Sequence, residues 1–287
     1  MQFFYSGLTS GSIYALVAIG FNIIYNTTGL INFAQGEFVV LGGMLMYTTL
    51  TILGLPVSVA FLVTFIIMFI VGVVFEKFFL RYVKLKTETN LIAITIALAV
   101  IMRGIAMVIW GRDSLAVPPY IEDKTISVIG GSMNSQSILV IIVCFFVAII
   151  LSSFFKYTKY GKAFRACYDD QTAATICGIN VNMIRMLSFA IASLLGALAG
   201  AIIAPITFVT YTDGIMAGLK GFAAAIIGGL GSFWGGLFGG FALGVIEGFF
   251  AFVLPSGFKD AFAFIILLLI LFIKPTGLFG KKKAVRV

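Results

Sequence analysis

The sequence predicts an all-α, polytopic membrane protein, because it is rich in apolar residues, poor in charges and divided into long apolar runs. Of its 287 residues, 61% are hydrophobic and 10% are charged. A soluble domain has about 25% charged residues, so most of this surface must face lipid or other helices. No low-complexity linker divides the chain, which predicts a single transmembrane domain over residues 1–287.

Nine apolar runs approach the ~20 residues that a helix needs to cross a membrane. In chain order they lie near residues 7–25, 34–53, 57–75, 90–110, 137–155, 186–205, 215–231, 235–254 and 258–274. The first follows a start without the positive residues of a signal peptide, so we expect it to be retained. The run 34–53 opens with the polar stretch NFAQGE, and the run 215–231 is bounded by glycines. Either could be broken or re-entrant where protein or a cavity shields its backbone, so we expect eight or nine transmembrane helices.

Basic segments predict the orientation, because cytoplasmic loops carry an excess of Lys and Arg. These residues gather in 76–89, 156–185 and the tail 274–287. Two spans separate the first segment from the second, and four separate the second from the third, so all three fall on one side. With three spans before the first segment, the N-terminus is outside and the C-terminus is cytoplasmic. The longest external connection is then 111–136.

Charged side chains in these connections have simple expected roles. Glu76, Arg81 and Lys84 lie at a span end and are expected to anchor it at the membrane interface. The formal net charge of +8 comes from a few short loops, which favours contact with anionic lipid headgroups and not with nucleic acid. The external connection contains Glu122 and Asp123.

The cytoplasmic segment 156–185 predicts a short capped helix within a polar loop. Asp170 is a good N-cap, and Asp169 beside it favours the positive end of a helix dipole. Gly178 suits the C′ position, where a positive φ costs little, and Asn180 or Asn182 can cap the following span.

That short helix has the composition of a docking surface. Ala173, Ala174 and Thr175 are small and would let a soluble partner approach closely. The alternative is a solvated helical loop that has no partner.

Several chemistries are absent from the sequence. It has no histidine, which excludes His-based acid–base catalysis and His metal sites, and it has no G-x-x-x-x-G-K-[ST] nucleotide loop. Cys144, Cys167 and Cys177 form no C-x-x-C pair, so we expect inert thiols. No carboxylate pair at helical spacing lies inside a span, which disfavours an intramembrane enzyme. We expect no catalytic residue, metal or cofactor in this chain.

The cytoplasmic segment is similar to the coupling-helix region of ABC importer permeases. The usual pattern is Gly-x-Ala-x-Arg-Ala, acidic residues, Ala-Ala and Gly-Ile. This chain has GKAFRA at 161–166, followed by Asp169-Asp170, Ala173-Ala174 and Gly178-Ile179. The resemblance assigns contact with an ATPase to Arg165, Ala166, Asp169, Asp170, Ala173, Ala174, Gly178 and Ile179.

Two further segments, 7–38 and 221–247, resemble the branched-chain amino acid permease family. Together the three segments span essentially the whole chain in the expected order. One departure is Gln35, where many members have His in an Asn-Phe-Ala-His-Gly-Glu motif, and it bears on the substrate and not on the family.

The resemblance implies an ATP-driven importer in the cytoplasmic membrane of a prokaryote. This chain would be one permease, paired with a second permease that is usually related but distinct. Two cytoplasmic ATPase subunits would bind ATP and Mg²⁺ and drive alternating access through the coupling helices. An extracytoplasmic binding protein would deliver leucine, isoleucine, valine or a related small solute, and urea or a short amide stays open.

Polar residues inside the spans are candidates for the translocation pathway, because a charge at mid-bilayer costs about 2.5–3.5 kcal/mol and faces the bundle interior or water. These candidates are Asn22, Asn32, Gln35, Glu37, Arg103 and Glu247. The alternative is an internal Arg103–Glu37 or Arg103–Glu247 pair that only holds helices together.

Glycines spaced by four predict close helix packing, since small residues let backbones approach in lipid. One row consists of Gly236, Gly240, Gly244 and Gly248, a second of Gly231, Gly235 and Gly239, and Gly196 pairs with Gly200. These rows would pack within the subunit, or they would form a surface that slides or contacts the second permease.

A self-contained secondary transporter or channel is the competing function class. It too would contain many spans, broken helices and buried carboxylates. It would not need a capped helix in a long cytoplasmic loop, and clear internal repeats are lacking.

Overall fold

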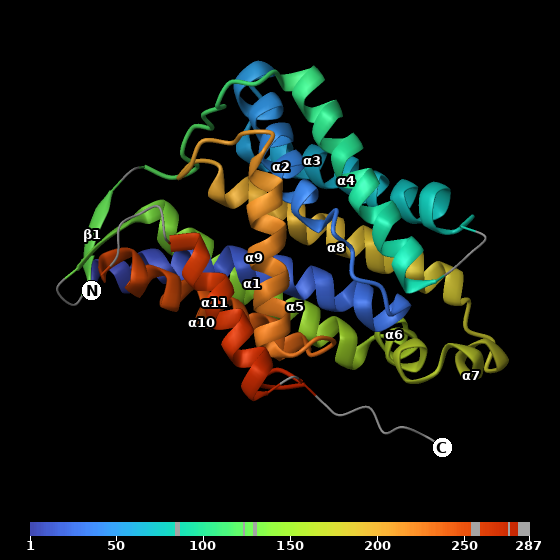
Figure 1. Cartoon of the computed structure of the whole chain (residues 1–287). Coiled ribbons are helices and arrows are strands. Elements are labelled where there is room, and N and C mark those ends of the chain that lie inside the picture. Colours follow the sequence, from blue (N-terminus) through green and yellow to red (C-terminus); the bar gives the residue numbers. More distant parts are fainter. Residues whose placement is uncertain (84–86, 123, 129–130, 254–258, 275, 281–287) are drawn as a thin grey trace.

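The computed structural model describes residues 1–83, 87–122, 124–128, 131–253, 259–274 and 276–280. Most residues in these ranges are helical, and β1 and β2 form a two-stranded antiparallel hairpin (Figure 1). In chain order the elements are α1 (Gln2–Thr28), α2 (Gln35–Tyr47), the π-helical η1 (Thr48–Ile52), α3 (Val57–Val74), the π-helical η2 (Phe75–Leu80), α4 (Glu88–Trp110), β1 (Thr125–Val128), β2 (Gly131–Asn134), α5 (Ser135–Tyr157), α6 (Lys159–Asp169), α7 (Gln171–Ile176), α8 (Val181–Ile203), α9 (Asp213–Gly228), α10 (Phe233–Val253) and α11 (Lys259–Ile273).

The predicted all-α membrane bundle is confirmed. Every predicted apolar run coincides with a helix in the described ranges, and six helical segments there are long and apolar enough to cross a membrane: Gln2–Thr28, Val57–Leu80, Thr89–Trp110, Ser135–Tyr157, Val181–Ile203 and Phe233–Ala251. The runs at 34–53, 215–231 and 258–274 form the shorter helices α2, α9 and α11. The first two of these are the runs whose regularity the sequence made doubtful.

Helix α1 forms the centre of the bundle, where it packs against α10, α8, α9 and α5. It runs antiparallel to α10, with Gly7 against Gly244 and Gly11 against Gly240. Because no side chain separates the backbones at these positions, the two helices lie in direct main-chain contact.

Helix α2 packs between α8 and α9, again through close backbone contacts at glycines. A Cβ on Gly200 would overlap the carbonyl oxygen of Val39, and one on Gly36 would overlap that of Gly214. The chain between α1 and α2 is not helical, yet Leu30, Asn32 and Ala34 are buried. Protein therefore shields this irregular backbone, which is the condition under which a membrane tolerates it.

The described parts of the basic segments gather at one end of the bundle, which we call the α7 end. Arg81 reaches the carbonyl of Asn182 there, and the amide of Phe279 donates to Gly228 at the α9–α10 turn. In Figure 1, α6 and α7 lie at this end, and the N-terminus lies beside β1 at the other. We call that other end the hairpin end. There Ser132 donates a hydrogen bond to Gln2, and Leu115 forms an antiparallel β-bridge with Val209.

Two described elements were not predicted. The β1–β2 hairpin pairs Thr125 with Asn134 inside the connection 111–136. Helix α6 lies in the segment that the sequence suggested was loop before Asp170. It is capped by the Thr158 hydroxyl, which accepts from the amide of Gly161, and it buries Phe164.

Candidate functional site

The short helix α7 is capped at both ends as the sequence predicts. Asp170 Oδ1 accepts the amides of Thr172 at 2.7 Å and Ala173 at 3.0 Å. The helix ends at Ile176, and Gly178 has a φ of 82°. Such a φ strains most residues but not glycine. Asn180 caps α8 through the amide of Met183 at 3.1 Å, so the predicted cap of the next span is confirmed.

Most of the residues assigned to ATPase coupling reach the surface. Arg165, Asp169, Asp170, Ala173 and Gly178 are exposed, and Ala166 and Ile179 are half-buried.

Ala174 differs, because it is 3% exposed and packs in the core of the chain. Its methyl group therefore faces inward and is not available to a partner. Ile176, which the sequence reasoning missed, is 82% exposed on the same helix. The sequence signal that could have identified Ile176 is an apolar residue inside an otherwise polar loop.

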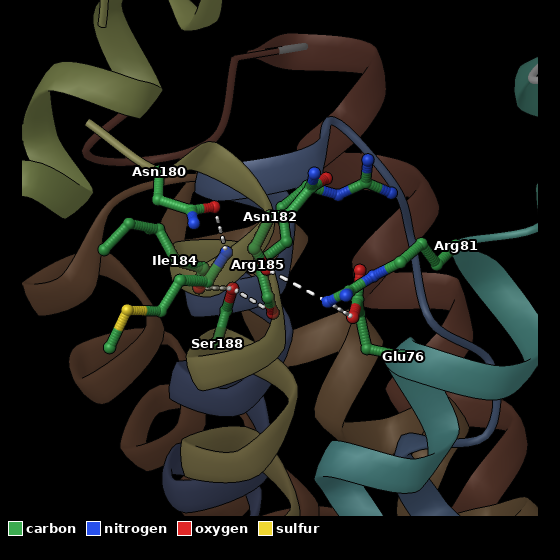
Figure 2. Close-up of polar contacts among 8 residues, drawn as sticks. Glu76, Arg81, Asn180, Asn182, Ile184, Arg185 and Ser188 are labelled. Carbon is green, nitrogen blue, oxygen red and sulfur yellow. Dashed lines mark hydrogen bonds and ion pairs between the residues drawn. The ribbon is translucent and has the colours of Figure 1, made fainter. Parts of the chain in front are cut away.

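Figure 2 shows how the chain after α3 is tied to the start of α8 at the α7 end. Arg81 Nη2 donates to Glu76 Oε2 at 2.8 Å and to the main-chain oxygen of Asn182 at 3.4 Å. Glu76 is fully buried, so its expected role as an interfacial anchor is wrong: it is the internal partner of Arg81. Lys84, the third expected anchor, lies outside the described residues, as does Asp123 of the opposite connection.

Among the residues that the structure describes, two ion pairs lie within the predicted spans. Arg103 on α4 pairs with Glu37 in the first turn of α2, which is one of the two internal pairs that the sequence allowed. The other, Arg103–Glu247, is wrong. Glu247 on α10 pairs instead with Lys220 on α9 at 2.8 Å, and the Lys220 ammonium lies 5.6 Å from the centre of the Tyr14 ring.

Sequence reasoning missed Lys220, although a charge in the middle of an apolar run was visible. The residue lines a cavity of about 340 Å³ between α1, α2, α8 and α9. Tyr14 and Asp213 give this cavity polar groups, while Val39 and Met216 supply apolar walls. The cavity can therefore contact a small molecule that is charged at one end and apolar at the other.

The uncharged pathway candidates occupy two places. Asn22 lies at the α7 end, where it holds the α9–α10 turn through Gly231 and Ser232. Asn32 and Gln35 are fully buried at the start of α2. Gln35 Nε2 donates to the carbonyl of Ala192 at 2.9 Å, and Asn32 Oδ1 accepts from Ala34.

These two buried amides keep unused hydrogen-bonding capacity. Asn32 Nδ2 and Gln35 Oε1 have no hydrogen-bond partner among the described residues. Buried polar atoms are nearly always paired, so these two atoms, three residues apart at the start of α2, could each bind a water or solute partner.

The predicted glycine rows lie against other helices of this chain. Gly236, Gly240, Gly244 and Gly248 face α1, and Gly196 and Gly200 face α2. Gly235 and Gly239 face α9, whereas Gly231 lies before α10, in the turn, with a φ of 84°. Gly231 is therefore not part of a helical row, because the helix begins at Phe233.

The chain matches a known family over nearly its whole length. The model described as the permease component of the branched-chain amino acid transport system matches residues 3–272. The high-affinity branched-chain amino acid transport system permease protein LivH of Salmonella typhimurium is 32% identical, over 100% of this chain and 97% of that protein. BraD of Pseudomonas aeruginosa, with the same description, is also 32% identical, over 100% and 98%.

A more distant relative and a solved structure also match this chain over most of its length. The probable branched-chain amino acid permease LivH of Methanocaldococcus jannaschii is 26% identical, over 92% of this chain and 88% of that one. A chain of PsaBC from Streptococcus pneumoniae, solved with a Fab, matches 96% of this chain and 93% of its own length with a TM-score of 0.51 at 16% identity. That last likeness bears on the fold alone.

Proposed function

Because the chain belongs to the branched-chain amino acid transport permease family, we propose that it forms half of a membrane path driven by separate ATPase subunits. The chain is a permease component of a branched-chain amino acid ABC transport system and a multi-pass protein of the inner membrane. The single observation that carries the coupled mechanism is α7, a capped helix held at the end of the bundle with Ala173 and Ile176 exposed.

The proposed assembly contains this chain, a second, related permease, two cytoplasmic ATPase subunits and an extracytoplasmic binding protein. ATP and Mg²⁺ would bind to the ATPase subunits, since this sequence lacks a phosphate-binding glycine loop. Closure of the ATPase pair would push on α7 and shift the bundle between outward-open and inward-open states. The whole chain would act as one domain without catalytic activity of its own.

The proposed path follows the polar groups between α1, α2 and α9. Its supports are the unpaired atoms of Asn32 and Gln35 and the cavity that contains Lys220 and Asp213. The Glu37–Arg103 and Lys220–Glu247 pairs would keep the charges of the walls balanced. A solute without net charge could then pass with little electrostatic penalty.

Reconstitution in liposomes tests the proposal. The chain is co-expressed with candidate partner subunits, purified as a complex, and assayed for leucine uptake and for ATP hydrolysis stimulated by the binding protein. We expect uptake only with ATP and the ATPase subunits. Uptake by this chain alone, without any ATPase, would instead establish a self-contained transporter.

Loss of the α7 cap is expected to weaken coupling. Asp170→Ala removes both capping bonds, which costs about 1 kcal/mol in a helix too short to be stable by itself. We expect uptake by the complex to fall about fivefold. Asp170→Asn is the matched control, because it removes the same charge but keeps a side-chain oxygen that can cap the helix. Equal losses in the two variants would assign the effect to charge and not to helix order.

Thiol labelling tests the proposed orientation. Cys177 is exposed after α7, whereas Cys144 and Cys167 are buried. Burial also raises the pKa of the Cys167 thiol, which lowers its share of reactive thiolate. With the α7 end in the cytoplasm, a membrane-impermeant maleimide should label Cys177 in inside-out vesicles and not in intact cells.

Glu122→Cys provides the reference for the other face, since Glu122 is exposed at the hairpin end. In a Cys177→Ser background this variant should label in intact cells. The reverse pattern for the two sites would place the N-terminus in the cytoplasm and refute the orientation.

A further inference from the structure

The last two turns of α1 carry side-chain hydrogen bonds to three other elements at the α7 end. Gln171 Nε2 on α7 donates to the main-chain oxygen of Thr27 at 2.8 Å. The Thr27 hydroxyl lies 2.6 Å from that of Ser188 on α8. Asn22 and Asn26 bind the α9–α10 turn. One segment of α1 thus joins α7, α8 and the start of α10.

The Gln171 contact fixes α7 to α1 at a point that needs a donor. Thr27 is in the last turn of α1, where carbonyl oxygens have no amide partner within the helix. Gln171 is the first residue of α7 and follows the N-cap Asp170 directly. A displacement of α7 therefore pulls on the end of α1 through one side chain.

The side chains of Asn22 and Asn26 bind the α9–α10 turn to α1 through three hydrogen bonds. Asn22 Nδ2 donates to Ser232 O at 2.9 Å, and Asn22 Oδ1 accepts from Gly231 N at 2.9 Å. Asn26 Nδ2 donates to Gly231 O, also at 2.9 Å. Because α9 ends and α10 begins at this turn, movement of the end of α1 reaches the helices that carry the Lys220–Glu247 pair.

Helix α6 leaves part of this region open. A cavity of about 350 Å³ lies between Asn22 and Asn26 on α1 and Arg165 and Tyr168 on α6. The face of α6 that carries Arg165 and Tyr168 thus borders open space toward Asn22 and Asn26, while Phe164 of the same helix is buried in the core. Beside this open space, the Gln171–Thr27 hydrogen bond is a direct polar link between α7 and α1.

We propose that Gln171 is a positioning residue that transmits the movement of α7 to the end of α1, from which Thr27, Asn22 and Asn26 pass it to α8 and to the α9–α10 turn. The inference rests on the proposed function, in which an ATPase subunit moves α7. Energetic coupling between distant sites can be carried by chains of packed side chains and hydrogen bonds, and the bonds described form a continuous chain of this kind.

Three variants of the assembled transporter separate transmission from docking. Gln171→Glu keeps the length of the side chain but, when ionised, cannot donate to the Thr27 carbonyl. An acidic residue in the first turn favours a helix, so α7 itself is not weakened. Gln171→Lys restores a donor at similar reach. Thr172→Glu places the same negative charge at the next residue of α7, whose side chain takes no part in the Gln171–Thr27 hydrogen bond.

The measurement is the number of leucine molecules imported per ATP hydrolysed in proteoliposomes with the cognate binding protein, together with complex assembly by affinity purification. We expect Gln171→Glu to lower that ratio by about fivefold, the factor for one lost hydrogen bond, with ATP hydrolysis changed by less than about twofold. Gln171→Lys and Thr172→Glu should stay within about twofold of wild type.

Other outcomes overturn the inference. A wild-type ratio in Gln171→Glu shows that the bond transmits nothing. Equal losses in Thr172→Glu assign the effect to surface charge, and loss of assembly in Gln171→Glu assigns it to docking. Failure of the wild-type complex to couple ATP hydrolysis to uptake is a different result, which refutes the proposed function itself.

Discussion

Lys220→Met is expected to destabilise the protein by about 3–5 kcal/mol, because it leaves the Glu247 carboxylate without its ammonium partner in the protein interior. Glu247 is 1% exposed, so its uncompensated carboxylate would stay largely out of contact with bulk water. Its Oε1 lies 2.8 Å from Lys220 Nζ in the folded protein. We expect the melting temperature of the purified protein in detergent to fall by roughly 10 °C, measured by fluorescence-detected gel filtration after heating.

The double variant Lys220→Met/Glu247→Met decides whether the loss comes from the broken pair. Replacing both members of a buried ion pair by apolar residues of similar size is often neutral, so stability should largely return. A double variant as unstable as the single one would contradict this account. Uptake by the stable double variant then separates two roles: unchanged uptake makes the pair purely structural, whereas lost uptake places Lys220 and its cavity on the path.

Gly240→Leu is expected to prevent formation of a stable bundle. A Cβ on Gly240 would overlap the main-chain nitrogen of Ala15, and backbone atoms in two packed helices cannot move aside as a side chain can. Overpacking in cores costs about 1–3 kcal/mol when side chains give way, and separation of α10 from α1 costs more. We expect no monodisperse protein on gel filtration in mild detergent.

Gly104→Leu is the matched control. Gly104 also lies inside a helix of a predicted span, α4, but a Cβ there meets no atom within 4 Å in the structure. Removal of a helix-interior glycine gains up to about 1 kcal/mol, so this variant should be at least as stable as wild type. Two equally well-behaved proteins would show that the α1–α10 contact does not need glycine.

Local signals in the sequence, namely apolar runs and capping residues, predicted much of the fold. Apolar runs of spanning length indicated the helices, since lipid requires every backbone group to be paired within its own segment. The α7 helix was equally local: an N-cap at Asp170 and a positive φ at Gly178 lie at fixed offsets from the helix that they bound. Helix α6 was missed because its sequence is largely polar, and the burial of Phe164 that anchors it depends on tertiary packing.

The sequence by itself determined the class of protein, the spans, the end of the bundle where basic residues gather and the residues that cap α7. Only the tertiary structure decided the partners: Glu247 with Lys220 and not with Arg103, Gln171 with Thr27, and Ala174 facing the core instead of a partner. The physical reason is distance along the chain. Capping and membrane insertion act within one helix. Ion pairs and backbone contacts depend instead on how two helices cross, and glycines that lie far apart in the sequence determine those crossings.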